Sequence, residues 1–309
     1  MPNQLFIDTP LINEAASHFR TLRDFIRFAV TQMTQAKVSF GQGTDNAFDE
    51  AAYLTLHTLN LPIDQLDPFL DAVLLPAERL MVLNVLAKRV NERLPAAYIT
   101  GEAWLQGYRF TVDKNVIIPR SPIAELLVSQ LDTWVDEPHD IKHVLDVCTG
   151  SGCLAILAAL VLPNAQVDAT DISEEALSIA KANVNDYNLS ARVHLHQGSL
   201  LEPLPAKHLY NMIICNPPYV NDASMQALPP EFMHEPSLAL AGGVDGMRLV
   251  SDLLNQCAKK LTSDGILFLE IGHERAHFDA AFKHLSPTWI DTLGTQDQIM
   301  MLTAAQLQS

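Results

Sequence analysis

A short apolar run that two consecutive prolines bring to an end constrains this chain more than any other stretch. Residues 211 to 219 read Asn-Met-Ile-Ile-Cys-Asn-Pro-Pro-Tyr. The run from Met212 to Cys215 has the length and composition of a strand buried in a parallel sheet. Proline cannot donate to a strand ladder and disfavours helical backbone in the residue before it, so Asn216 is expected in an extended turn at the strand's carboxyl end. Open α/β sheets bind their ligands at that edge.

This turn offers two hydrogen-bond acceptors side by side. Asn216 has a side-chain carbonyl, and the backbone carbonyl of Pro217 is left free by Pro218, which has no N–H. Two fixed acceptors suit a planar NH2 group, a poor nucleophile that reacts only when it is oriented and its developing positive charge is stabilised. Tyr219 adds a ring that can pack on a planar group or lie near a cation. A strand that simply ends in a proline turn is the structural alternative.

Length and charge narrow the possible classes of protein. A chain of 309 residues predicts one large domain and a smaller one. The 20 basic and 36 acidic side chains give a net charge of −16, which argues against a sequence-independent nucleic-acid binder and favours a basic protein partner. We expect a cytosolic protein, since neither a signal peptide nor an apolar run of about 18 residues is present. The four cysteines are interpreted as buried thiols, and because none of the 11 histidines has zinc spacing, no metal is expected.

The first part of the chain has helical periodicity. Apolar residues between Leu11 and Val38 predict one core-facing helix. Asp45 or Asn46 is expected to cap a second helix after a turn-rich break at residues 40–46. Pro76 opens a third, whose apolar side is expected to carry Leu80, Leu83, Leu86, Val90 and Leu94. Residues 1–94 are therefore interpreted as a small helical domain that recognises the substrate.

The spacing of apolar residues changes from a helical to a strand-like pattern between residues 95 and 120. Tyr98, Trp104, Tyr108, Phe110, Val112 and residues 116–118 lie in short β-like runs divided by turn residues. Residues 95–120 thus predict a β-hairpin linker, which ends in Pro119-Arg-Ser-Pro122. Ser121 can cap a helix over residues 123–134.

Residues 121–309 form the second predicted domain, and it opens with a glycine turn. Residues 143–153 read His-Val-Leu-Asp-Val-Cys-Thr-Gly-Ser-Gly-Cys, which predicts a buried strand, a tight turn over 149–152 and a helix over 154–162. Gly150 and Gly152 allow close approach of a ligand to the backbone at a helix amino terminus. Asp171 ends the next strand about 20 residues later, where an acid binds ribose hydroxyls. Asp171 can alternatively cap the helix over 174–185, and it can fill both roles.

The glycine turn favours a cofactor without a phosphate. A pyrophosphate-binding fingerprint normally has three glycines, whereas this turn has two and is preceded by Asp146 inside the strand end. A molecule with an amino group and a ribose fits Asp146, Gly150 and Gly152 better. S-adenosylmethionine is such a molecule, and its sulfonium methyl is the electrophile that a nucleophile held at Asn216 requires.

The remaining segments complete a doubly wound pattern. Strands are predicted at 192–196, 212–215 and 266–271, a helix at 249–261, and a terminal antiparallel pair at 289–293 and 298–303. The long stretch 220–247 leaves the Asn-Pro-Pro-Tyr turn directly, so we interpret it as a lid or a substrate-docking loop.

These motifs together resemble the class I methyltransferases that act on planar NH2 groups, and more closely the protein-glutamine methyltransferases. The helical first domain, the hairpin, residues 119–122 and the Glu235-Pro236 to Gly246 stretch all follow that pattern. Residues 40–46, the Arg-Ser-Pro turn and Asp-Val-Cys-Thr-Gly-Ser-Gly are similar to the branch that methylates the third protein of the large ribosomal subunit. The release-factor branch usually has Pro-Arg-Pro followed by an acid.

The resemblance implies a fold and roles for particular residues. It implies a Rossmann-like α/β sheet of seven strands with S-adenosylmethionine as cofactor. The catalytic turn would hold the substrate glutamine through Asn216 and the Pro217 carbonyl, with Pro218 and Tyr219 beside it. Arg120 is a further candidate for substrate binding, with a solvated turn residue as the alternative.

The implied cofactor site has one departure from the family pattern. Cofactor binding is expected to involve Asn216 and the residues Asp146, Thr149, Gly150, Gly152 and Asp171. Family members often carry an acid that faces the adenine amine, and Ser199 stands at the matching place here. Its hydroxyl can still accept that hydrogen bond, so weaker adenine selectivity is expected.

Other functions share part of this pattern. The acceptor could be a glutamine of a peptide release factor, or an exocyclic amine in a nucleic acid, against which the negative charge argues. A non-catalytic assembly scaffold is the third possibility, although degenerate copies tend to lose the reactive turn and here it is complete.

Overall fold

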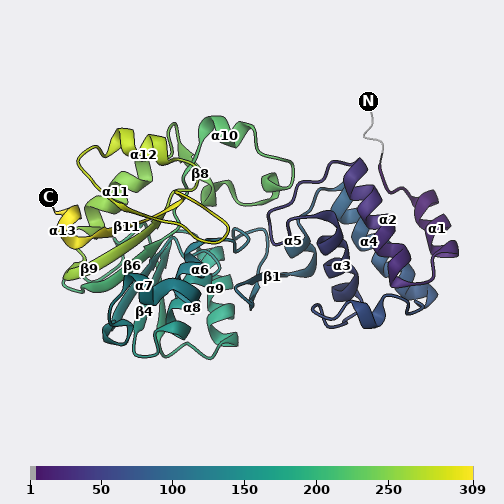
Figure 1. Ribbon diagram of the computed structural model, residues 1–309, viewed down its shortest axis with the longest axis horizontal. Coiled ribbons are helices and arrows are strands. Elements are labelled where there is room, and N and C mark those ends of the chain that lie inside the picture. Colours follow the sequence, from purple (N-terminus) through teal and green to yellow (C-terminus); the bar gives the residue numbers. More distant parts are fainter. Residues whose placement is uncertain (1–4, 309) are drawn as a thin grey trace. The chain divides into compact units, whose positions relative to one another are not determined.

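The computed structural model describes residues 5–308, which divide into two compact units. The helical unit consists of the chain up to Ala103 together with Pro229–His234. The sheet unit consists of Trp104–Leu228 and the chain from Glu235 onward. Figure 1 colours both units along the sequence.

The helical unit is built from amphipathic helices that share one core. Asn46 caps α3 by accepting hydrogen bonds from the backbone of Phe48 and Asp49, and Pro76 is the first residue of α4, both as predicted. Its helices are α1 (Thr9–His18), α2 (Leu22–Gln35), α3 (Ala47–Thr58), the short η1 (Asp67–Phe69), α4 (Pro76–Asn91) and α5 (Ala96–Thr100). Their apolar sides meet in a core that includes Phe25, Met33, Leu54, Leu83 and Leu86.

The prediction of a single helix between residues 11 and 38 is wrong. The chain breaks between α1 and α2 because Thr21 begins a new helix, and the Asp24 carboxylate accepts the backbone N–H groups of Arg20 and Thr21 at 2.8 and 2.9 Å. This arrangement satisfies donors that a continuous helix would use internally. Leu80 also departs from its predicted burial, since it is 42% exposed.

The predicted hairpin is shorter than expected. Strands β1 (Glu102–Leu105) and β2 (Tyr108–Thr111) pair as a two-stranded sheet. Tyr98, however, lies in α5, which ends at Gly101 in the left-handed conformation. Residues 116–118 form no strand, and the backbone N–H of Ile118 donates instead to the carboxylate of Glu235.

The sheet unit contains the seven-stranded sheet that the resemblance implies. Its strand order is β10-β11-β9-β6-β3-β4-β5, and only the pairs that involve β11 are antiparallel. The strands are β3 (His143–Val147), β4 (Gln166–Asp171), β5 (Val193–Gln197), β6 (Tyr210–Cys215), β9 (Leu261–Glu270), β10 (Thr288–Ile290) and β11 (Ile299–Thr303). The terminal antiparallel pair is thus confirmed, whereas the strand predicted from residue 266 begins at Leu261.

Helices cover both faces of this sheet, so the central strands are apolar throughout. Val144 and Ile214 belong to one core with α8, and Leu145 and Ile213 belong to a second core with α11. The helices are α6 (Ile123–Glu125), a π-helical turn (Leu126–Gln130), α7 (Leu131–Trp134), η3 (Pro138–Asp140), α8 (Cys153–Val161), α9 (Glu174–Asp186), α11 (Arg248–Cys257), α12 (Arg275–Ala281) and α13 (Ala304–Leu307). The helix predicted to reach residue 261 therefore ends at Cys257.

The long stretch after β6 has more structure than a simple loop. It contains β7 (Val220–Asn221), α10 (Asp222–Gln226), η4 (Phe232–His234), η5 (Ser237–Ala239) and β8 (Ala241–Gly243). Strands β7 and β8 pair in parallel, separately from the main sheet. Within residues 5–308, no helix is both long and apolar enough to cross a membrane.

Candidate active site

The strand order brings the two predicted ligand-binding turns to one edge of the sheet. Strand β3 lies between β4 and β6, and Val147 at its end is in register with Cys215 at the end of β6. The glycine turn and the Asn-Pro-Pro-Tyr turn therefore begin at the same level. From β3 the chain first adds strands on the β4 side of the sheet and later adds β6 on the opposite side of β3. The order of the strands therefore reverses between β3 and β6, and doubly wound sheets bind ligands at such a topological switch point.

A cavity of about 330 Å³ lies at this edge, a volume within the range of small-molecule sites. Among the predicted site residues, those that line it are Gly150, Asp171, Ser199, Asn216 and Pro218. Apolar side chains make up much of the remaining lining, including Ile117, Ile172, Leu200, Leu238 and Leu249. The other predicted residues, which are Asp146, Thr149, Gly152, Pro217, Tyr219 and Arg120, are not among the lining residues.

Asp171 is bound to the glycine turn and does not cap the following helix. Its carboxylate accepts the backbone N–H of Gly150 at 2.8 Å and that of Ser173 at 2.9 Å, one on each oxygen. Ser173 is the residue that caps α9, because its hydroxyl accepts the N–H of Ala176. The alternative role for Asp171 is thus wrong, and both of its oxygens keep a lone pair for a further donor such as a hydroxyl.

Asp146 supports the glycine turn from within the protein. Its side chain is 1% exposed, and Oδ2 accepts the Thr149 hydroxyl at 2.6 Å and the backbone N–H of Ala155 at 3.0 Å. Oδ1 is buried and has no hydrogen-bond partner among the described residues. Burial raises the pKa of this carboxyl to about 7. Within residues 5–308, Oδ1 is therefore a buried acceptor without a partner behind the glycine turn, and Asp146 does not itself line the cavity.

The second glycine of the turn is required by packing. Gly152 has φ +79°, and a Cβ there would lie 3.1 Å from the Cβ of Ala180 in α9. A larger residue would push the turn away from the helix. Gly152 therefore allows the turn to pack closely on α9, although it does not line the cavity.

Tyr219, the last residue of the Asn-Pro-Pro-Tyr turn, is held by a carboxylate that sequence reasoning missed. Its hydroxyl donates to Glu270 Oε1 at 2.8 Å, and the hydroxyl of Ser121 donates to Oε2 of the same carboxylate at 2.5 Å. Burial raises the pKa of Glu270, which is 4% exposed. Gly272 lies directly against the ring, since a Cβ there would be 2.5 Å from Tyr219 Cε2. The ring is fixed by these contacts.

Arg120 is not a solvated turn residue. Its guanidinium donates to both oxygens of Glu235 at 2.5 and 2.8 Å, and this carboxylate also accepts the N–H of Ile118 at 3.0 Å. The pair joins the proline turn to the chain that follows η4. Only the fold reveals this pairing, because 115 positions separate the two residues.

Other lining residues were also missed. Asn115 and Arg248 contribute to the cavity, as do Pro236 and Ala239 from the stretch before β8 and Gly242 from β8 itself. Cys148 lines it too and is only partly buried, unlike the other three cysteines. Across the described part of the chain, no group of three or more His, Cys, Asp or Glu side chains has the arrangement of a metal site.

Comparison with known proteins places this chain in a family. The domain described as "Methyltransferase small domain" matches residues 122–243. "Ribosomal protein uL3 glutamine methyltransferase" of Bordetella pertussis is 58% identical over 297 residues, which cover 96% of this chain and 99% of that protein. The proteins of the same name from Burkholderia pseudomallei and Neisseria meningitidis serogroup A are 51% and 48% identical, and cover 94% and 96% of this chain. This chain belongs to the family of ribosomal protein uL3 glutamine methyltransferases.

Proposed function

We propose that this protein transfers a methyl group from S-adenosylmethionine to the side-chain amide nitrogen of a glutamine in ribosomal protein uL3. The observation that carries the proposal is the cavity at the sheet edge, which Asn216 and Pro218 line together with Gly150 and Asp171. The names of relatives that match nearly the whole chain support the same substrate.

The described residues suit the chemical groups of the cofactor. Asp171 has lone pairs for the ribose hydroxyls, and the apolar side chains of the lining suit an adenine ring. The Ser199 hydroxyl is available to the adenine amine, and the unpaired Oδ1 of Asp146 suits the amino group. When bound, the cofactor supplies a methyl group made electrophilic by a sulfonium.

The catalytic turn acts on the acceptor nitrogen. The Asn216 side-chain carbonyl and the Pro217 backbone carbonyl accept the two amide hydrogens, which orients the nitrogen and stabilises the positive charge that it gains during attack. The Pro217 and Pro218 rings restrict the backbone, so the two acceptors are held in place before the substrate binds. The released proton passes to water.

Replacing Asn216 tests this role directly. The Asn216→Ala variant is expected to lose about 100-fold or more in methyl transfer, because one of two preorganised acceptors is gone. S-adenosylhomocysteine affinity, measured by isothermal titration calorimetry, should change little. Full transfer activity in this variant would contradict the acceptor role.

The substrate is tested with a ribosomal-protein extract from cells that lack the modification. With labelled cofactor, we expect the label on uL3 and on a glutamine within it, identified by mass spectrometry. Label on a release factor or on RNA, with none on uL3, would contradict the proposal.

A further inference from the structure

The loop after the catalytic turn leaves the sheet unit and then returns to it. Residues 229–234 belong to the helical unit, whereas the chain up to Leu228 and from Glu235 belongs to the sheet unit. The returning stretch contributes Pro236, Leu238 and Ala239 to the cavity lining. In chain order, the segment 229–234 therefore lies between the catalytic turn and one wall of the cavity.

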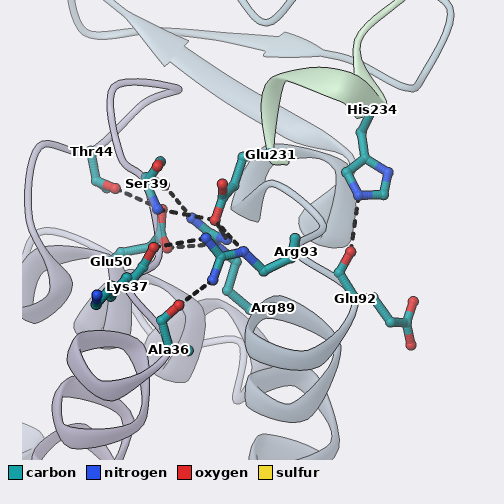
Figure 2. Close-up of polar contacts among 10 residues, drawn as sticks. All are labelled: Ala36, Lys37, Ser39, Thr44, Glu50, Arg89, Glu92, Arg93, Glu231 and His234. Atoms are coloured by element: carbon teal, nitrogen blue, oxygen red, sulfur yellow. Dashed lines mark hydrogen bonds and ion pairs between the residues drawn. The ribbon is translucent and has the colours of Figure 1, made fainter. Parts of the chain in front are cut away.

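Glu231 fastens this segment within the helical unit. Its side chain is fully buried, and Oε1 accepts the backbone N–H of Ser39 at 3.0 Å. The same oxygen lies 3.3 Å from a terminal nitrogen of Arg89, which donates to it, and 2.9 Å from Nε of Arg93. Figure 2 shows Ser39, Arg89 and Arg93 around Glu231. Ser39 follows α2, Arg89 lies in the last turn of α4, and Arg93 follows that helix.

The buried cluster is electrically balanced only when Glu231 is present. Nε of Arg89 donates to Glu50 at 2.6 Å, so Arg89 and Arg93 face Glu50 and Glu231 as two cations and two anions. The side chains of Arg89 and Glu50 are 1% and 4% exposed. Removing one partner of a buried pair leaves a charge that water cannot solvate. The helical unit thus needs a residue supplied from far along the chain.

A second carboxylate anchors the same loop in the other unit. Glu235 follows four positions after Glu231 and binds Arg120 and the Ile118 N–H within the sheet unit. The cavity wall begins with the next residue, Pro236. Loss of the Glu231 anchor should therefore release residues 222–234 and leave the wall of the cofactor site in place.

We propose that Glu231 is a positioning residue for methyl transfer to a protein. By docking residues 229–234 in the helical unit, it holds the loop that must accommodate the polypeptide around the target glutamine. Glu235 holds the cofactor wall separately. The expected change in KM for uL3 rests on the proposed function. The docking of residues 229–234 is measurable by hydrogen exchange without any methyl transfer.

The Glu231→Gln variant tests this division of roles. Amide hydrogen exchange in residues 222–234 is expected to accelerate about tenfold or more, because a buried arginine loses its counter-charge. The KM for uL3 should rise about tenfold, with kcat within about twofold of the parent value. The Kd for S-adenosylhomocysteine should stay unchanged.

Matched variants separate docking from general damage. Glu92→Gln makes the same chemical change at an exposed side chain of the same unit and should alter none of these quantities. Combining Glu231→Gln with Arg93→Gln restores one cation and one anion, so the double variant should lose less protection than the sum of the single variants. Should Glu231→Gln unfold the unit, His234→Ala removes only the ring's 3.0 Å hydrogen bond to the Glu92 carbonyl and should give a weaker effect in the same direction.

Two results would overturn the proposal. If Glu231→Gln changes neither the hydrogen exchange of the loop nor the KM for uL3, Glu231 does not position the loop. If the Kd for S-adenosylhomocysteine rises as much as the KM for uL3, Glu231 and Glu235 do not act separately. If the parent protein methylates no uL3, the proposed function fails, while exchange and cofactor titration still decide whether Glu231 docks the loop.

Discussion

Asp146 is a buried carboxyl group with a pKa raised to about 7, so it titrates near neutral pH. The neutral form predominates below that value and the carboxylate above it. Under the proposed function, the positively charged amino group of S-adenosylmethionine pairs with the ionised form. Cofactor affinity is therefore predicted to rise between roughly pH 6 and 8, with proton release on binding at the lower end.

Isothermal titration of S-adenosylhomocysteine in buffers of different ionisation enthalpy measures both effects. The Asp146→Asn variant should bind more weakly and lose most of the pH dependence. The stability of the ligand-free protein should change in the opposite direction. Because the pKa of Asp146 in the folded state lies above the ordinary aspartate value of 3.8, stability should fall as pH rises from about 4 to about 7. Affinity that is flat across this range would contradict the assignment.

Site residues next to a proline or glycine could be predicted from the sequence. Site residues whose hydrogen-bond partners lie far away in the chain could not. Asn216 and Gly150 stand out because proline and glycine restrict or free the backbone wherever they occur. Glu231 and Glu270 have no such signature, since their partners lie as far as 192 and 149 positions away. A glutamate is expected at the protein surface when only the sequence is known, because its burial requires a cation or hydroxyl partner that only the fold reveals.

Among the elements, the end of β9 and the catalytic turn are packed too closely to tolerate a side chain between them. Gly272 has φ +52°, and an added Cβ would meet the Tyr219 ring. Gly272→Ala is predicted to cost about 1–2 kcal/mol in stability from the backbone alone and to displace the ring, which should lower kcat. Urea unfolding and steady-state kinetics measure the two effects.

Gly294→Ala is the matched control for this change. A Cβ at Gly294 meets nothing within 4 Å, and its φ lies outside the strained range. That variant should behave as the parent protein. Equal activity of both alanine variants would show that the position of the Tyr219 ring does not matter for transfer.

Element boundaries were harder to predict than element types. The apolar period runs through residues 11–38 without interruption, yet Thr21 and Asp24 divide it by capping α2. Tyr98 reads as a strand residue by type, but Pro95 and Gly101 delimit a short helix around it. In both places, hydrogen bonds at helix ends decided the structure over the side-chain pattern.

At the scale of the whole molecule, the net charge of −16 bears on the proposal that the substrate is a basic protein. Long-range attraction between exposed charges is screened within about 10 Å at 0.1 M salt. The KM for uL3 is therefore predicted to rise several-fold between roughly 50 and 300 mM salt, with kcat nearly constant. Steady-state assays over a salt series check this, and a KM independent of salt would show that surface charge plays no part.

The path of the chain through Pro229–His234 also limits how this protein can be divided. A truncated gene that ends at codon 103 would encode α1 to α5 but neither η4 nor Glu231, and the product would carry two arginines opposite one glutamate. Such a fragment is predicted to be less stable than the complete unit, because a buried arginine lacks its counter-charge. Shuffling or fusing the amino-terminal part onto another enzyme would have to bring the six-residue insert with it.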